Sequence, residues 1–211
     1  GPLTRPLLAE VEPAPAHEIR ARLDDLVAQG MLAELDAGRW DVRHALVRDV
    51  ASAQVLRQRR GDLHGRWARA LEKDAPGDGP AGHSRVGLHY DLAGEPLLAA
   101  THLGVAGEAY LLLHAHAEAV AHLRRAWEVL CDAPAADPEQ RCAVGAALAS
   151  SLNALDRSGE AAAILEALET DDLRTADRVR VGRIFVQSGW VAFSSRREVA
   201  LARGLLDRGI A

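Results

Sequence analysis

The chain has few of the residues that staple small folds together or bind metal ions. Its 211 residues include only two cysteines, Cys131 and Cys142, which are eleven positions apart and form no CxxC pair. This number and spacing exclude a disulfide framework and disfavour a zinc site. We therefore expect both thiols to be reduced and the fold to depend on its apolar core alone.

Aromatic residues are also scarce, at 4% of the chain, while alanine, leucine and arginine dominate. This composition disfavours strands and favours helices. No stretch reaches the roughly 18 uninterrupted apolar residues of a membrane span. The N-terminus has no basic region followed by an apolar core, as a secretory signal would. We expect no membrane contact and a cytoplasmic location.

Lysine is nearly absent, and this excludes the commonest nucleotide-binding loop. Lys73 is the only lysine and it follows Glu72, so there is no Gly-Lys-Ser/Thr sequence for a P-loop. The GxSxG and HExxH patterns of hydrolases and metalloproteases are missing as well. We expect no catalytic residue, no metal and no cofactor in this chain. The chain also begins with Gly-Pro and contains one methionine, Met31, which suggests a piece of a longer protein.

The N-terminal part, residues 1–73, predicts a helix followed by a β-hairpin. Apolar residues share one face of a helix over 17–29, and Gly30 ends it. Residues 31–35 and 39–43 alternate around a glycine-containing turn, as hairpin strands do. Residues 3–16 are proline-rich and are expected to be extended. This pattern is typical of a partial winged helix, with connector helices at 45–56 and 58–73.

A Pro/Gly-rich linker is expected at 74–82, followed by repeated helices over 83–211. Gly87, Tyr90, Ala99, Leu103 and Ala106 recur twenty residues later as Gly107, Tyr110, Ala119, Leu123 and Ala126. Small residues at fixed offsets among large apolar ones predict helices stacked side by side. The breaks predict helices at 83–93, 96–113, 115–132, 138–156, 160–169, 174–193 and 196–209.

These small and large positions resemble the tetratricopeptide-repeat signature. Leu103 stands where the signature prefers tryptophan, and the spacing is twenty instead of thirty-four. The segment from Trp40 to Ala51, with Arg59-Arg60 and Leu63-His64, resembles the junction of STAND-class signalling ATPases. There it joins a winged helix to a helical-repeat sensor. Large LuxR-type transcriptional regulators and cyclase-linked ATPases share that layout.

The resemblance implies a mainly α fold, in which a partial winged helix precedes a tetratricopeptide-like α-solenoid. It implies a non-catalytic sensor region whose ATPase domain, with ATP or ADP, lies elsewhere in the parent protein. In STAND proteins, a histidine at the position of His44 can touch the β-phosphate of the nucleotide. That role for His44 requires the ATPase domain, and the alternative is a histidine that only fixes the wing-to-helix junction.

The predicted ligand or partner groove lies on the helical repeats. Its candidate residues are His83, Tyr90, Tyr110, His114 and Arg124, and ordinary packing between helices is the alternative for both tyrosines. His114, His116 and His122 are expected to be surface histidines, because their spacing does not place them on one helical face.

Arginines concentrate between positions 39 and 69, although the whole chain has a net charge of −5. That segment has eight arginines and three aspartates, a local excess of five positive charges. Arg57, Arg59, Arg60, Arg66 and Arg69 form its cluster, which could contact phosphates or an acidic partner.

Three functions remain open from the sequence. The leading one is a sensor region of a bacterial regulator that binds an inducer or a regulatory protein on the repeats. The second is a protein-interaction scaffold without a small ligand. The third is DNA binding by the winged helix, which the net charge disfavours. A homo-oligomer is compatible with all three.

Overall fold

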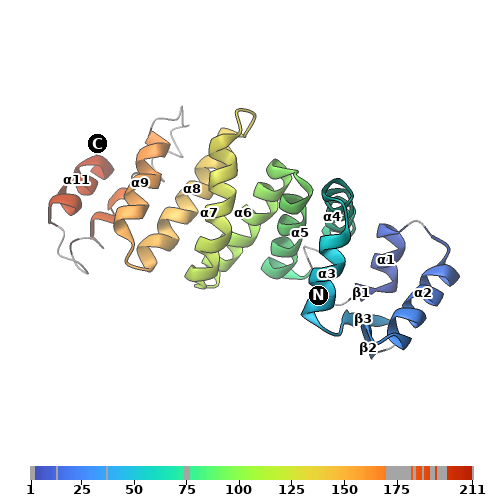
Figure 1. Cartoon of the computed structure of the whole chain (residues 1–211). Coiled ribbons are helices and arrows are strands. Elements are labelled where there is room, and N and C mark those ends of the chain that lie inside the picture. The colour runs from blue at the N-terminus through green and yellow to red at the C-terminus, as the bar shows by residue number, and fades with distance from the viewer. Residues whose placement is uncertain are drawn as a thin grey trace.

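A small module that contains a β-sheet and a long row of helices make up the computed structural model of the chain (Figure 1). It describes residues 3–12, 14–36, 38–73, 77–169, 182, 184–186, 188–190, 193 and 199–210. In these residues, a three-stranded antiparallel sheet near the N-terminus precedes a repeat-like stack of helices. The predicted fold class, mainly α with a partial winged helix followed by helical repeats, is confirmed.

The N-terminal module is built from two helices and three strands. Its elements are β1 (Leu3–Thr4), α1 (Arg5–Val11), α2 (Ala16–Ala28), β2 (Leu32–Asp36) and β3 (Arg39–Val42). The strand order is β1-β3-β2, with Leu3 opposite Trp40. Leu23, Leu32 and Trp40 form its buried core. Gly30, at φ +73°, lets the chain leave α2 and enter the sheet directly.

The prediction of an extended segment over residues 3–16 is wrong. Leu3 and Thr4 form the strand β1, and the helix α1 follows at once, so the segment is helical from Arg5 to Val11. Pro6 is compatible with this helix because it stands in the first turn, where its missing N–H has no intrahelical partner. Val11 is buried at the end of α1. The two helices and the hairpin with its added strand β1 therefore make a fuller winged-helix arrangement than the sequence predicted.

The connector consists of α3 (Ala45–Gln54) and α4 (Arg57–Glu72). No residue of α3 is buried, and Leu46 is 72% exposed. In contrast, α4 packs against α1 of the module and against α5 of the stack. Arg66 Nη1 donates to the Val11 carbonyl at 3.2 Å, and Lys73 Nζ to Glu10 at 2.9 Å. Of the two connector helices, α4 is therefore the one that holds the module against the stack.

The stack continues with helices of 12 to 17 residues. They are α5 (Gly79–Ala93), α6 (Pro96–Leu112), α7 (His116–Asp132), α8 (Pro138–Ala154), α9 (Ser158–Glu169) and α11 (Val199–Ile210). Proline starts α6 and α8, and Gly94, at φ +78°, ends α5. None of the described helices combines the length and the apolar character needed to cross a bilayer.

The predicted linker at 74–82 is shorter than the composition indicated. Residues 79–82 already belong to α5, because Pro80 stands in its first turn. Residues 74–76, 174–181 and 194–198 lie outside the described residues, and so do the boundaries predicted within them. The other predicted helices of the stack are present with small shifts at their ends.

The twenty-residue repeat corresponds to a repeated packing relation between neighbouring helices. A Cβ atom at Gly87 would lie within 3 Å of the Leu103 side chain, and one at Gly107 within 3 Å of Leu123. The side chain of the leucine sixteen residues later therefore packs directly against the backbone of each glycine. The relation between α5 and α6 recurs between α6 and α7, so the period is one helix with its turn. This explains a spacing of twenty where a two-helix repeat has thirty-four.

The helices lie in two rows with different bonds between them. In one row, Arg-carboxylate pairs join α5 to α7, α7 to α9 and α9 to α11. They are Asp91–Arg125, Glu160–Arg124 and Glu166–Arg208. In the other row, α6 contacts α8 where Gly104 faces Val144, and Gln140 donates to Thr101 at 3.1 Å. One row is thus joined by charge and the other by close backbone approach.

We expect Gly107→Ala to destabilise the chain by about 1–3 kcal/mol, because the new methyl group would overlap Leu123. Gly204→Ala in α11 is the matched control, since a Cβ atom there meets nothing within 4 Å. It should be neutral or stabilise by about 0.5–1 kcal/mol through helix propensity. Urea unfolding followed by circular dichroism measures both. Equal effects of the two variants would contradict the packing relation.

Candidate functional site

A network of polar side chains joins α4, α5 and α6 at the start of the stack. Tyr90 OH donates to Glu72 Oε2 at 2.7 Å. His102 Nε2 lies 3.1 Å from Glu72 Oε1, and His102 Nδ1 lies 3.1 Å from His83 Nδ1. The ring of His102 stacks between the rings of Tyr90 and His83, with centroids 5.7 and 5.3 Å away. The glutamate therefore receives bonds from two other helices.

The charges in this network are set by burial and by these bonds. The Tyr90 hydroxyl bond lowers the pKa of Glu72, and the His102 bond lowers it further. Burial, with the Glu72 carboxylate beside it, raises the pKa of Tyr90 to about 12. Burial lowers the pKa of His83, and His102 adds to this effect. At neutral pH, an ionised Glu72 accepts from a neutral phenol and an imidazole N–H.

A second histidine pair joins α4 to α5. His64 Nδ1 and His89 Nδ1 are 2.9 Å apart, and Trp67 stacks on His89 at 6.2 Å. Burial lowers the pKa of His89 to about 4, with His64 as the next cause. Burial and Arg60 lower the pKa of His64. Two facing Nδ1 atoms share a hydrogen bond only when one ring accepts, so the pair requires at least one neutral imidazole.

The repeat also reproduces a stacked tyrosine and histidine one helix further along. Tyr110 stacks on His122 at 5.4 Å, as Tyr90 does on His102. Ser84 Oγ lies 3.2 Å from His122 Nε2, but its single proton goes to the Pro80 carbonyl at 2.8 Å. His122 must then donate to Ser84, so it does not activate the serine as a base. This pair holds helices together and has no geometry for nucleophilic attack.

The five predicted groove residues do not form one groove. His83 and Tyr90 meet in the network, and Tyr110 lies against His122. His114 is an exposed residue of the turn after α6, at φ +58°, with His116 beside it. Arg124 is bound to Glu160 at 2.8 Å in the ion-pair row. Three of the five therefore support helix packing, and Arg124 is a strut between α7 and α9.

The packing roles of His102 and His122 were not predicted from the sequence, which placed His122 at the surface, although a signal was present. His102 and His122 occupy equivalent positions of the twenty-residue repeat, each twelve residues after its tyrosine. Their recurrence marks them as part of the repeat. Glu72 has no such signal, because its role depends on a contact between the end of α4 and His102 of α6, which local spacing does not reveal.

Histidines and acids do not cluster as a metal site in the described part of the chain, where no three or more candidate ligands come together. His44 stands at the start of α3, exposed to solvent, with no hydrogen bond from its side chain to the helix end.

The arginine cluster on α4 divides into bound and available side chains. Arg60 and Arg66 donate to the carbonyls of Ser52 and Val11 at 3.2 Å, and Arg69 lies 3.8 Å from Glu95. Arg57 and Arg59 are exposed and have no ion pair within the residues that the structure describes. The available positive charge is therefore at the start of α4, next to the exposed helix α3.

An apolar stripe on α6 remains exposed, although seven of the 17 residues of that helix, from Ala99 to Gly107, are buried. Leu98, Val105 and Leu112 are 42%, 43% and 81% exposed, at helical spacing along one side. Thr101, which stands between them, uses its hydroxyl internally, donating to the Leu97 carbonyl and accepting from Gln140. We call Leu97, Leu98, Thr101, Val105 and Leu112 the α6 stripe.

The chain matches no known protein family, no curated protein and no solved structure. The assignment of function consequently depends on the surfaces and contacts described above.

We expect Tyr90→Phe to lower the free energy of unfolding by about 0.5–1.5 kcal/mol, because Glu72 loses a bound hydroxyl. Tyr110→Phe is the matched control, since Tyr110 contributes a stacked ring to the equivalent position of the repeat. Tyr110→Phe should lower the free energy of unfolding by less than Tyr90→Phe does. Urea unfolding measures both variants, and a larger loss for Tyr110→Phe would contradict the role of the network.

The free energy of unfolding should fall as the pH drops from about 6.5 to about 4. In this window an unfolded His89, with its ordinary pKa of 6.5, binds a proton that the folded chain takes up only near pH 4. His64, His83 and His122 have lowered pKa values and contribute with the same sign.

We expect His89→Gln to reduce this pH dependence, because glutamine stays neutral throughout the window. The control is His17→Gln, on an exposed position of α2. Urea midpoints between pH 7.5 and 4.5 provide the measurement. If the two variants keep the same slope as the unaltered chain, His89 does not carry the effect.

Proposed function

We propose that the chain is a non-catalytic interaction and sensor region of a regulatory protein, in which the helical stack presents the α6 stripe to a protein partner. The observation that carries this proposal is the exposed apolar side of α6, whose opposite side is buried in the stack. A helix that is apolar all round is usually covered on every side. An exposed row of leucine and valine therefore supports a surface that a partner covers.

The connector supports a second covered surface in the same protein. Helix α3 exposes Leu46 and Val50, and Leu56, just before α4, is exposed as well. Arg57 and Arg59 follow it in the sequence. A partner surface with apolar and acidic side chains would complement both features. In the STAND arrangement that the sequence resembles, the nucleotide-binding module of the parent protein would lie here. His44, at the start of α3, would then approach the phosphates of ATP or ADP.

On this proposal, the region acts in the cytoplasm and links two surfaces. A protein or inducer bound to the stack would favour one position of the connector over another. Such a shift requires that the ligand bind one state more tightly than the other. A scaffold without a small ligand is the nearest alternative, and it would use the α6 stripe without any response at α3.

DNA binding is less favoured, because of the charge of α2. This helix follows α1 and precedes the hairpin, in the place of the recognition helix of helix-turn-helix proteins. It carries Glu18, Asp24 and Asp25 against two arginines, and both arginines pair with acids. A phosphate backbone would meet a helix with more acidic than basic side chains.

We expect a photo-crosslinking amino acid in place of Val105 to trap one protein partner in the cell, and the same amino acid in place of Leu88 to trap none. Leu88 is a matched control, because it is 56% exposed on α5, which belongs to the other row. With the identified partner purified, Val105→Asp should weaken binding at least tenfold and Leu88→Asp should not. Equal trapping from both positions, or none from position 105, would contradict the proposal.

A further inference from the structure

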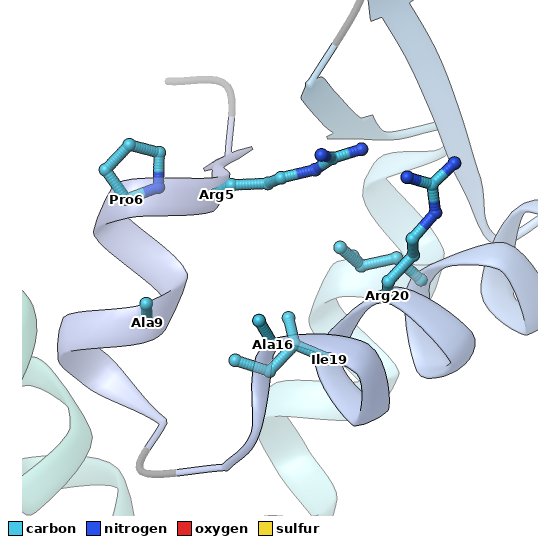
Figure 2. A pocket seen from close by; sticks show the side chains of 7 residues that line it. Arg5, Pro6, Ala9, Ala16, Ile19 and Arg20 are labelled. Carbon is cyan, nitrogen blue, oxygen red and sulfur yellow. The ribbon is translucent and has the colours of Figure 1, made fainter.

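A pocket in the N-terminal module lies apart from both proposed partner surfaces. It opens between α1 and α2 and has a volume of about 270 Å³, near the lower end of the size range of small-molecule sites. Pro6 and Ala9 line it from α1, and Ala16, Ile19 and Leu23 from α2. The small side chains of Ala9 and Ala16 leave the space between the two helices open (Figure 2).

Two arginines stand at the edge of this apolar pocket. Arg5 and Arg20 line both the pocket and the adjoining open cleft beside Glu34 and Gly38. Figure 2 shows both guanidinium groups extending away from Ala16 and Ile19, on the side of the sheet. The pocket therefore has an apolar floor and a mouth with two positive side chains.

The arginines at the mouth keep most of their capacity to bind an anion. Arg5 lies over the Trp40 ring, 5.7 Å from its centroid, and has no carboxylate at ion-pair distance among the described residues. Arg20 lies 3.8 Å from Asp24, but both side chains are more than 60% exposed. Such an exposed pair contributes about 1 kcal/mol or less, so a ligand carboxylate can compete with Asp24. A guanidinium binds a carboxylate with two parallel hydrogen bonds.

We propose that the pocket between α1 and α2 binds a medium-chain fatty acid, with its carboxylate at Arg5 and Arg20 and its chain against Ala9, Ala16 and Ile19. The apolar floor selects the alkyl chain, because its burial removes apolar surface from water. The arginines select the acid over an alcohol or amine of the same length.

Binding there would join three elements that the sequence brings together only in space. The ligand would touch α1 and α2 directly, and through Arg5 it would touch the ring of Trp40 on β3. Because α1 packs against α4, the site lies one helix away from the connector. This site is separate from the α6 stripe, so its test and that of the proposed function are independent.

The probe is sodium octanoate, titrated into the 211-residue chain by isothermal calorimetry, with octylamine and 1-octanol as ligands of the same length. We expect octanoate to bind at one site and the other two to bind at least tenfold more weakly. Arg20→Gln should weaken octanoate binding at least tenfold. Arg22→Gln should leave it unchanged, because Arg22 is also an exposed, ion-paired arginine of α2 but does not line the pocket.

Ala16→Leu gives an independent check, because it fills the pocket and keeps both arginines. It should abolish octanoate binding while circular dichroism shows an unchanged helical content. The proposal is overturned if octanoate does not bind below its micelle-forming concentration, if octylamine or octanol binds as tightly, or if Arg22→Gln weakens binding as much as Arg20→Gln.

Discussion

The close approach of neighbouring helices is the constraint on which the stack depends. At Gly87 and Gly107 the missing side chain is the space that Leu103 and Leu123 occupy. Trp127 uses the same device at Gly145 in α8. Because protein interiors are packed as densely as organic crystals, such contacts allow few alternative positions for the helices. The rows of ion pairs and polar bonds form only because these contacts set the distance between helices.

Stacked tyrosine and histidine side chains lie between the same neighbouring helices as the glycine–leucine contacts. The ring of each repeat tyrosine stacks on a histidine of the next helix. His102 also bonds to His83, His122 to Ser84, and Tyr90 to Glu72. The first of these clusters includes α4, which does not belong to the twenty-residue repeat. Glu72 therefore extends the bonding pattern of the stack to the connector. The hydrogen bonds between facing histidines at the junction of α4 with α5 and α6 form only while at least one imidazole of each pair is neutral.

Local patterns in the sequence predicted the elements of the stack better than their contacts. The twenty-residue period identified Gly107 and Leu123 because both are determined by one packing relation that repeats. The ion pairs of Arg124 and Arg125 were not predicted, since helices two positions apart meet only after the stack has formed. Pro6 was misleading for a local reason: proline ends helices in their interior but is well tolerated in their first turn. The α1–α2 pocket has no sequence signature, because alanine is frequent throughout this chain.

Along α4, residues that contact α1 of the module alternate with residues that contact α5 and α6 of the stack. His64 bonds to α5, Arg66 to the end of α1, Glu72 to α5 and α6, and Lys73 to Glu10 of α1. Since the two sets of contacts are interleaved over the same turns, the helix cannot roll away from one neighbour without also leaving the other. Helix α4 is therefore the element that bonds α1 of the winged-helix module to the first two helices of the stack. A change in the position of α4 would therefore alter contacts on both of its sides, with α1 and with α5 and α6.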